Sequence, residues 1–254
     1  MKRLTFDALT VDVFDDLPAL AHAAAVAAVD ALRDAIAERG EANVMFATGN
    51  SQLAFLAELV QVKDVAWERV RAFHMDEYAG IAHTHPASFQ RYMRQRVAAK
   101  LPVKEFNYLN GDTGDGRAEA YRYAHLLRQH PLDLCCCGIG ENGHLAFNDP
   151  PVADFDDPLD VKVVALEPAS RRQQVGEGHF ESLDDVPTHA ITVTVPALLR
   201  AERVLVIVPE TRKADPVHTA LYGPVSTACP ASVLRRHANA TLFLDDASSA
   251  RLES

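Results

Sequence analysis

The segment from Leu132 to Pro151 brings together residue types that could perform acid–base chemistry. An apolar run, Leu134 to Cys137, is typical of a buried strand, and the glycine-rich turn GIGENG follows it. Behind the turn come His144 and then Asp149. Imidazole titrates near neutral pH and can both take and give a proton. A histidine and a carboxylate that follow a strand in this way indicate a catalytic loop on an α/β sheet.

Three further polar clusters stand where predicted strands end: TGNS at 48–51, HMDEY at 74–78 and PETRK at 209–213. The carboxyl ends of parallel strands all lie at one edge of a sheet. We therefore expect the clusters to converge with the histidine loop and to form one site from four distant segments.

The clusters supply candidate ligands of two kinds. The 48–51 turn connects a strand to a helix, a layout in which backbone N–H groups point at a bound anion. Lys213 stands near a predicted helix start, where the helix dipole disfavours a cation. A role in binding a ligand explains its position better than a structural role does. Asp76 and Glu77 could be a helix-starting pair, but adjacent side chains point in different directions. One of them could enter the site while the other stays structural.

The glycine spacing of the histidine loop also satisfies the dinucleotide fingerprint G-x-G-x-x-G, which is a weak signal by itself. The fingerprint requires a long helix directly after the glycines. Pro150 and Pro151 stop any helix within about two turns, because neither has a backbone N–H to donate. We therefore reject a nicotinamide cofactor. We also expect no metal site.

The elements that must position these residues alternate between strand and helix. Helical spacing predicts helices over 17–39, 88–97 and 116–129, while apolar or alternating runs predict strands over 43–47, 134–137, 161–166, 190–195 and 203–208. This order predicts a Rossmann-like α/β fold, with a mainly parallel sheet and helices on both faces. No repeat or low-complexity linker interrupts the chain, so we expect a single domain over residues 1–254.

Composition limits the partners. The formal net charge of −10 argues against nucleic acid and against an acidic membrane surface. No apolar run approaches the length of a membrane span, and we expect a cytoplasmic protein. The side chains of Cys135, Cys136 and Cys137 alternate between opposite faces of a strand, so they cannot jointly hold one metal ion. We interpret them as small buried hydrophobic residues.

Several of these motifs, taken in order, resemble the glucosamine-6-phosphate deaminase (isomerase) family. They are the TGNS turn, MDEYAGI followed by HPASF, the loop GIGENGHLAFNDP, and DDVPTHAIT. The resemblance covers the chain from about Val44 to Leu244. The sister family, 6-phosphogluconolactonase, shares the fold and a G-x-x-GH loop but normally lacks the AFN sequence after the histidine.

The resemblance implies conversion of glucosamine 6-phosphate and water to fructose 6-phosphate and ammonia, without a cofactor. It implies that Asp76 is the base that moves a proton between C2 and C1, and that His144 opens the sugar ring. Asn142 and Asp149 fall where the family supports that histidine. The family's phosphate site corresponds to Thr48, Gly49, Asn50, Ser51 and Lys213, and we add Glu77 and Gly140 to the substrate-binding residues.

This chain departs from the family in two places. Asn142 stands where many relatives have Asp, and Asp149 where Glu is usual. The segment RRQQVGEGHF, at 171–180, lacks the arginine that binds phosphate in the family and has Gly178 or Glu177 there instead. Arg171 or Arg172 could substitute from upstream, and we take Arg172 as the candidate.

Four functions therefore stay open. The first is a glucosamine 6-phosphate deaminase, and the second is a deaminase for another hexosamine phosphate. The third is a 6-phosphogluconolactonase, and the last is a sugar-phosphate-binding regulator without turnover. The expected partner is in each case a sugar phosphate, and for the preferred function a phosphorylated amino sugar. Whether the chain forms a homo-oligomer is left open.

Overall fold

The structure is a computed structural model that describes residues 1–252. Eleven strands form two sheets. The large sheet has the strand order β1-β2-β11-β10-β7-β3-β4-β6. Its strands are β1 (Lys2–Phe6), β2 (Leu9–Phe14), β3 (Ala42–Phe46), β4 (Val70–His74), β6 (Glu105–Asn107), β7 (Leu134–Cys137), β10 (Arg203–Val208) and β11 (Ala240–Asp245).

All neighbouring strands from β2 to β6 in this sheet run parallel, and only β1 and β2 pair antiparallel. The prediction of a mainly parallel α/β sheet is therefore confirmed. The helices around it are α1 (Leu17–Arg39), α2 (Leu53–Leu59), α3 (Phe89–Met93), α4 (Gly116–Gln129), α5 (Pro168–Gly176), α6 (Val195–Leu199) and α7 (Ala214–Tyr222).

The smaller sheet consists of β5 (Asp76–Tyr78), β9 (His189–Val193) and β8 (Val161–Ala165), paired antiparallel in that order. The sequence predicts β8 and β9 as strands but does not separate them from the parallel sheet. Alternating hydrophobicity indicates a strand without identifying its partner. The partner of β9 is β5, which follows β4 directly in the chain but belongs to the smaller sheet. Just before β5, Met75 O accepts a hydrogen bond from Val193 N (2.8 Å).

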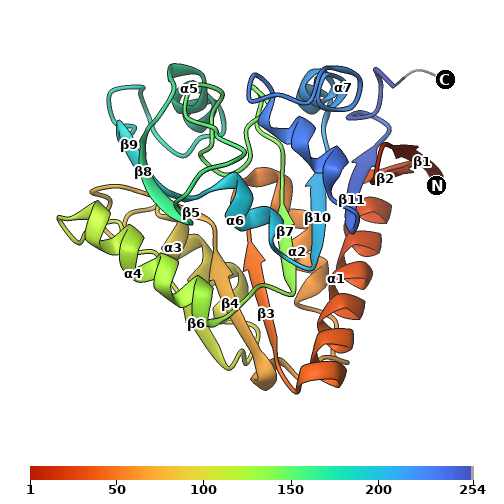
Figure 1. Cartoon of the computed structure of the whole chain (residues 1–254), viewed down its shortest axis with the longest axis horizontal. Helices are drawn as coiled ribbons and strands as arrows, with labels where there is room; N and C mark the ends of the chain where they lie inside the picture. The colour runs from red at the N-terminus through yellow and green to blue at the C-terminus, as the bar shows by residue number, and fades with distance from the viewer. Residues whose placement is uncertain (253–254) are drawn as a thin grey trace.

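The longest helix, α1, has clear sequence reasons for both of its ends. Asp16 caps its N-terminus by accepting a hydrogen bond from Ala19 N (2.8 Å), and Pro18 fits the first turn. Gly40 ends the helix with φ +81°, a left-handed conformation that glycine adopts without steric cost. The many alanines of α1 let its buried face lie close against the sheet (Figure 1).

Helices cover both faces of the large sheet, so two hydrophobic cores form. The side chains of Cys135 and Cys137 belong to the core on the side of α4, α6 and α7, whereas Cys136 belongs to the core under α1 and α2. The predicted alternation of the cysteines is therefore confirmed. The single helix predicted over 88–97 is shorter than expected, because α3 ends at Met93 and continues as a π-helical turn at Arg94–Ala98.

Candidate active site

The four polar clusters converge at the carboxyl edge of the large sheet. β3, β4, β7 and β10 are parallel, and the clusters at 48–51, 74–78, 138–144 and 209–213 follow their ends. From β3 the chain proceeds outward to β4 and β6, then returns to β7 on the other side of β3. The loops after β3 and β7 therefore diverge, which opens a crevice of the kind that binds ligands in α/β sheets.

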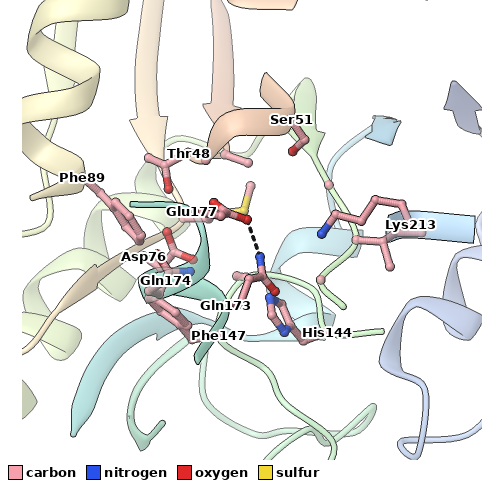
Figure 2. Close-up of a pocket in the computed structure, with 17 residues that line it drawn as sticks. Thr48, Ser51, Asp76, Phe89, His144, Phe147, Gln173, Gln174, Glu177 and Lys213 are labelled. Atoms are coloured by element: carbon pink, nitrogen blue, oxygen red, sulfur yellow. Dashed lines mark hydrogen bonds between the residues drawn. The ribbon is translucent and has the colours of Figure 1, made fainter. Parts of the chain in front are cut away.

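A pocket with about 570 Å³ of empty space, its open mouth included, occupies this crevice. Seven of the residues expected from the sequence contribute to its wall (Figure 2). They are Thr48, Gly49, Ser51, Asp76, Gly140, His144 and Lys213. The convergence predicted for the strand ends is thus confirmed.

The part of the pocket near β3 and β10 is suited to an anion. Gly49 has φ +101° and begins a short helical turn that leads into α2. Lys213 reaches the pocket from the other side and is 3% exposed. Burial, followed by the charge of Arg212, lowers the pKa of Lys213. Among residues 1–252 its ammonium has no ion-pair or hydrogen-bond partner, so an anionic ligand would supply the missing contact.

His144 is held in a fixed orientation by groups behind it. Its Nδ1 lies 2.7 Å from Asn142 Oδ1 and 3.0 Å from Asp149 Oδ1. Asn142 donates its own amide to Asp149 Oδ1 (2.8 Å), so its oxygen faces the ring as an acceptor. With two acceptors around it, Nδ1 carries the proton, and Nε2 is the nitrogen left to accept one.

Asp149 is completely buried and receives further support from Ser170, whose hydroxyl donates to Oδ1 (2.5 Å). Burial raises the pKa of Asp149, but hydrogen bonding to His144, Ser170 and Asn142 outweighs burial and lowers it. An ionised carboxylate beside Nδ1 stabilises the charge that the ring gains when it takes up a proton. The shorter side chain at this position therefore reaches the histidine.

Gly140 lies against the His144 ring. A Cβ added to Gly140 would overlap three atoms of the imidazole. A glycine is therefore required at position 140 because the imidazole occupies the space of a side chain, not because of the backbone angles. Gly140, predicted to bind substrate, packs against the face of the histidine ring.

Asp76 is the carboxylate that faces the pocket from β5. Its side chain is almost fully buried, and in the described chain Oδ1 has no hydrogen-bond partner. Burial, followed by the neighbouring charge of Glu77, raises the pKa of Asp76 well above its usual range. A carboxylate with a raised pKa is a stronger base, which suits proton abstraction near neutral pH.

The other expected site residues lie outside the pocket wall. Glu77 is buried behind it, and the Asn50 amide donates to the backbone oxygen of Glu177 (3.4 Å). Arg172 lines a neighbouring surface hollow, and Arg171 donates to the backbone oxygens of two loop residues, Leu183 and Val186. The structure therefore brings neither arginine to the pocket in the part of the chain that it describes.

Sequence reasoning did not place Gln173 and Gln174, which line the pocket from the end of α5, where no predicted strand ends. Glu177, one of the two residues that the sequence offered in place of the family's arginine, follows the helix and lines the pocket with them. The i,i+4 and i,i+3 spacings of Gln173 and Gln174 to Glu177 are the signal that could have indicated the two glutamines. Phe89 and Phe147 add aromatic walls, with ring centroids 5.8 Å apart.

Within residues 1–252 no group of three or more His, Cys, Asp or Glu side chains is arranged to hold a metal ion. None of the helices described is long and apolar enough to cross a membrane.

Residues 15–243 match a protein family described as glucosamine-6-phosphate isomerases/6-phosphogluconolactonase. Glucosamine-6-phosphate deaminase from Listeria monocytogenes serotype 4a is 36% identical over 214 residues, which cover 84% of this chain and 89% of that protein. The enzyme of the same name from Bacillus thuringiensis (strain Al Hakam) is 36% identical over 199 residues, 78% of this chain and 74% of that protein.

Solved structures give the same result for the fold. A monomeric glucosamine-6-phosphate deaminase superimposes with a TM-score of 0.86 at 28% identity, covering 94% of this chain and 98% of its own. A 6-phosphogluconolactonase from Shewanella baltica OS155 superimposes with a TM-score of 0.75 at 20% identity, covering 92% of this chain and 96% of its own. The second likeness concerns the fold alone.

Proposed function

This chain belongs to the family of glucosamine-6-phosphate isomerases and 6-phosphogluconolactonases, and on that premise we propose that it converts glucosamine 6-phosphate and water to fructose 6-phosphate and ammonia. One observation carries the proposal. An unpartnered buried carboxylate, a held imidazole and an uncommitted ammonium, those of Asp76, His144 and Lys213, line the same pocket.

The first step is ring opening at His144. With Nδ1 protonated toward Asn142 and Asp149, Nε2 takes the proton of the sugar O1 hydroxyl and returns one to the ring oxygen. The charge that appears on the imidazole between these transfers is stabilised by Asp149. The product is the open-chain amino aldehyde, whose C2 proton is acidic because it lies next to the carbonyl carbon.

The second step is proton transfer at Asp76. Its carboxylate removes the proton from C2 while a proton passes from the substrate's ammonium group to O1, which gives an enolamine. Asp76 then delivers the first proton to C1, which leaves an iminium group at C2. Water then adds to that carbon, and ammonia leaves to give the ketose. A general base of this kind contributes ~100- to 10,000-fold to the rate. In the described chain no protein donor satisfies the buried oxygen Oδ1 of Asp76, so hydrogen bonding does not offset the cost of burying the charged carboxylate.

The decisive experiment measures ammonia and fructose 6-phosphate released from glucosamine 6-phosphate by the purified protein. We expect both products in equal amounts, and their loss in Asp76→Asn while the variant stays folded. Full deaminase activity in Asp76→Asn would contradict the assigned base. Hydrolysis of 6-phosphogluconolactone without ammonia release from the amino sugar would identify the sister activity instead.

Galactosamine 6-phosphate, tested in parallel, separates the epimers. Binding of either sugar phosphate without any turnover would favour a regulator that has kept the fold. Asp76 and His144, both present and both facing the pocket, support the enzyme.

A further inference from the structure

A carboxylate occupies the part of the pocket that is otherwise suited to an anion. Glu177 follows α5 and lines the pocket with a side chain that is only 5% exposed. Its Oε2 lies 3.9 Å from the place where a Cβ on Gly49 would stand, so the carboxylate sits over the 48–51 turn. The Asn50 amide, which donates to the backbone oxygen of Glu177, ties the two segments together.

Glu177 is held as an anion by three neighbours. Gln173 Nε2 and Arg212 Nη1 each donate to Oε1 (2.8 Å), and His179 Nε2 lies 3.4 Å from Oε2. Burial alone raises the pKa of Glu177, but the contacts with His179 and Gln173 and the charge of Arg212 outweigh it and lower the pKa to about 2. The carboxylate is therefore charged throughout the neutral range.

The guanidinium of Arg212 is already paired with carboxylates. Besides Glu177 it contacts Glu210 Oε2 (2.6 Å) and Glu141 Oε1 (3.3 Å). The uncommitted cation of the pocket is Lys213, which points into the same space as Glu177 (Figure 2). A ligand group here meets a cation and the turn on one side and a fixed carboxylate on the other.

A fully ionised phosphate fits these surroundings poorly, because one of its oxygens would face Glu177 and the like charges repel. A single proton on the phosphate removes that conflict. The P–OH group then donates a charge-assisted hydrogen bond to the carboxylate. The second pKa of a phosphate monoester is about 6, so the protonated form is accessible near neutral pH.

We propose that this pocket binds the phosphate of its ligand as the singly protonated monoanion, with Glu177 accepting a hydrogen bond from the P–OH group. Lys213 and the backbone N–H groups of the 48–51 turn hold the remaining oxygens. The inference deepens the proposed function and rests on it for the presence of a phosphate on the ligand. It makes Glu177 a residue that determines specificity between oxyanions.

The other titratable groups around Glu177 are few. His179 and Arg212 touch it, Lys213 lines the same pocket, and Tyr92 and Tyr78 are near enough to interact with its charge. Burial raises the pKa of both tyrosines, so they stay neutral at the pH values of the test. His179 touches Glu177 directly, so a His179→Gln variant separates the contribution of this neighbour from that of the ligand.

The test compares two unreactive open-chain ligands, glucitol 6-phosphate and glucitol 6-sulfate, by calorimetric titration between pH 5.5 and 8. The sulfate ester is a monoanion that has no proton to donate. We expect wild type to bind the phosphate with an affinity that falls toward ~10-fold per pH unit above the phosphate pKa of about 6, and to bind the sulfate at least ~10-fold more weakly at pH 5.5.

In Glu177→Gln the dependence on pH should flatten or reverse, and the sulfate should bind about as well as the phosphate. The matched control is Glu181→Gln, which removes an exposed carboxylate of the same loop and should behave as wild type. Thermal unfolding of each variant checks that it is folded. Glu177→Asp, which keeps the carboxylate, provides a second variant that should retain a preference for phosphate.

Equal binding of sulfate and phosphate by wild type, or phosphate binding that tightens from pH 6 to pH 8, would overturn the proposal. The same holds if Glu177→Gln leaves both affinities and their pH dependence unchanged. Binding is measured without turnover, so a protein that releases no ammonia still gives a clear result here. Failure of the proposed reaction and failure of this inference are thereby distinguished.

Discussion

Two acidic residues that are neighbours in the sequence have opposite surroundings in the fold. Glu77 accepts hydrogen bonds from Tyr78 N (3.0 Å), Ser88 Oγ (2.8 Å) and Gln90 N (2.8 Å), and so anchors the start of α3. In the described chain Asp76 Oδ1 has no such partner. The carboxylate of Glu77 stabilises the fold, whereas that of Asp76 lines the pocket without a hydrogen bond to Oδ1. This arrangement trades stability for reactivity.

That trade can be measured in Asp76→Asn. Because the folded-state pKa of Asp76 is raised by burial and by Glu77, its protonated form is favoured in the native protein. Its stabilising contribution is complete at low pH and is lost as the pH rises through the raised value. We expect Asp76→Asn to be more stable than wild type by about 1–3 kcal/mol at pH 8, with a melting temperature higher by about 2–4 °C per kcal/mol.

Scanning calorimetry from pH 4 to pH 8 checks this expectation, with Asp156→Asn on an exposed loop as the control. The gap between variant and wild type should close at acidic pH. A variant less stable than wild type at every pH would show that Asp76 has a structural role.

Gly140 is predicted to control the position of His144 through contact alone. In Gly140→Ala the new methyl group takes the place of the imidazole, so the ring must swing away from Asn142 and Asp149. We expect kcat for glucosamine 6-phosphate to fall by about 100-fold or more. Gly176→Ala is the matched control, because a Cβ there meets nothing within 4 Å.

Steady-state kinetics would check this, with near-ultraviolet circular dichroism to confirm the native fold. An activity within a few-fold of wild type in Gly140→Ala would mean that the ring tolerates a second position.

At the scale of elements, β7 shows how one strand serves both core and site. It lies between β3 and β10, so its cysteines contribute to the cores on both faces while its carboxyl end leads into the histidine loop. A hydrogen bond with Cys137, followed by burial, raises the pKa of Cys135, and burial raises that of Cys136. A thiol that is buried and protonated packs as a hydrophobic group and does not react.

The thiols therefore provide a test of the buried strand. We expect no reaction of Cys135, Cys136 and Cys137 with a disulfide reagent in the native protein, because all three side chains are buried and out of the reagent's reach. In denaturant all four cysteines of the chain should react rapidly. Absorbance from the released thiol counts them, and rapid labelling of these three without denaturant would contradict the buried strand.

Across the whole molecule, the pocket forms where the two sheets meet. The large sheet provides the loops after β3, β7 and β10, and the small sheet provides Asp76 from β5. The end of α5, at the top of the view in Figure 1, and the residue after it add Gln173, Gln174 and Glu177. A ligand in the pocket thus contacts segments that are distant in sequence, and binding should stabilise them together.

Hydrogen exchange with saturating glucitol 6-phosphate tests this coupling. We expect slower exchange at 48–51, 138–144 and 173–177, and unchanged exchange in the part of α1 far from the pocket. At 100 times the dissociation constant, the ligand should add about 2.7 kcal/mol to the free energy of unfolding. Lys213→Met, which removes the uncommitted cation, should lose most of this protection. Protection confined to a single segment would contradict a shared site.

Much of the site could be predicted from the sequence, because strand-end loops carry local signals. A glycine turn after an apolar run identifies the loop of His144, and the rule for parallel strands predicts that it meets Asp76 and Lys213. The surroundings of each carboxylate could not be predicted. The sequence at Asp76 and Glu77 does not indicate which carboxylate accepts hydrogen bonds from backbone N–H groups. Those N–H groups belong to residues 78–90, and their positions depend on how that segment folds back.

The sequence by itself determined the parallel α/β sheet, the alternation of the cysteines and the meeting of four strand ends, because each follows from local periodicity and from the polarity of the chain. Only the tertiary structure decided that β5, β8 and β9 form a separate antiparallel sheet, and that Glu177 rather than an arginine completes the pocket. Strand partners and helix placement depend on long-range packing, which no local pattern encodes. The charge that a ligand meets in this pocket is therefore a property of the fold.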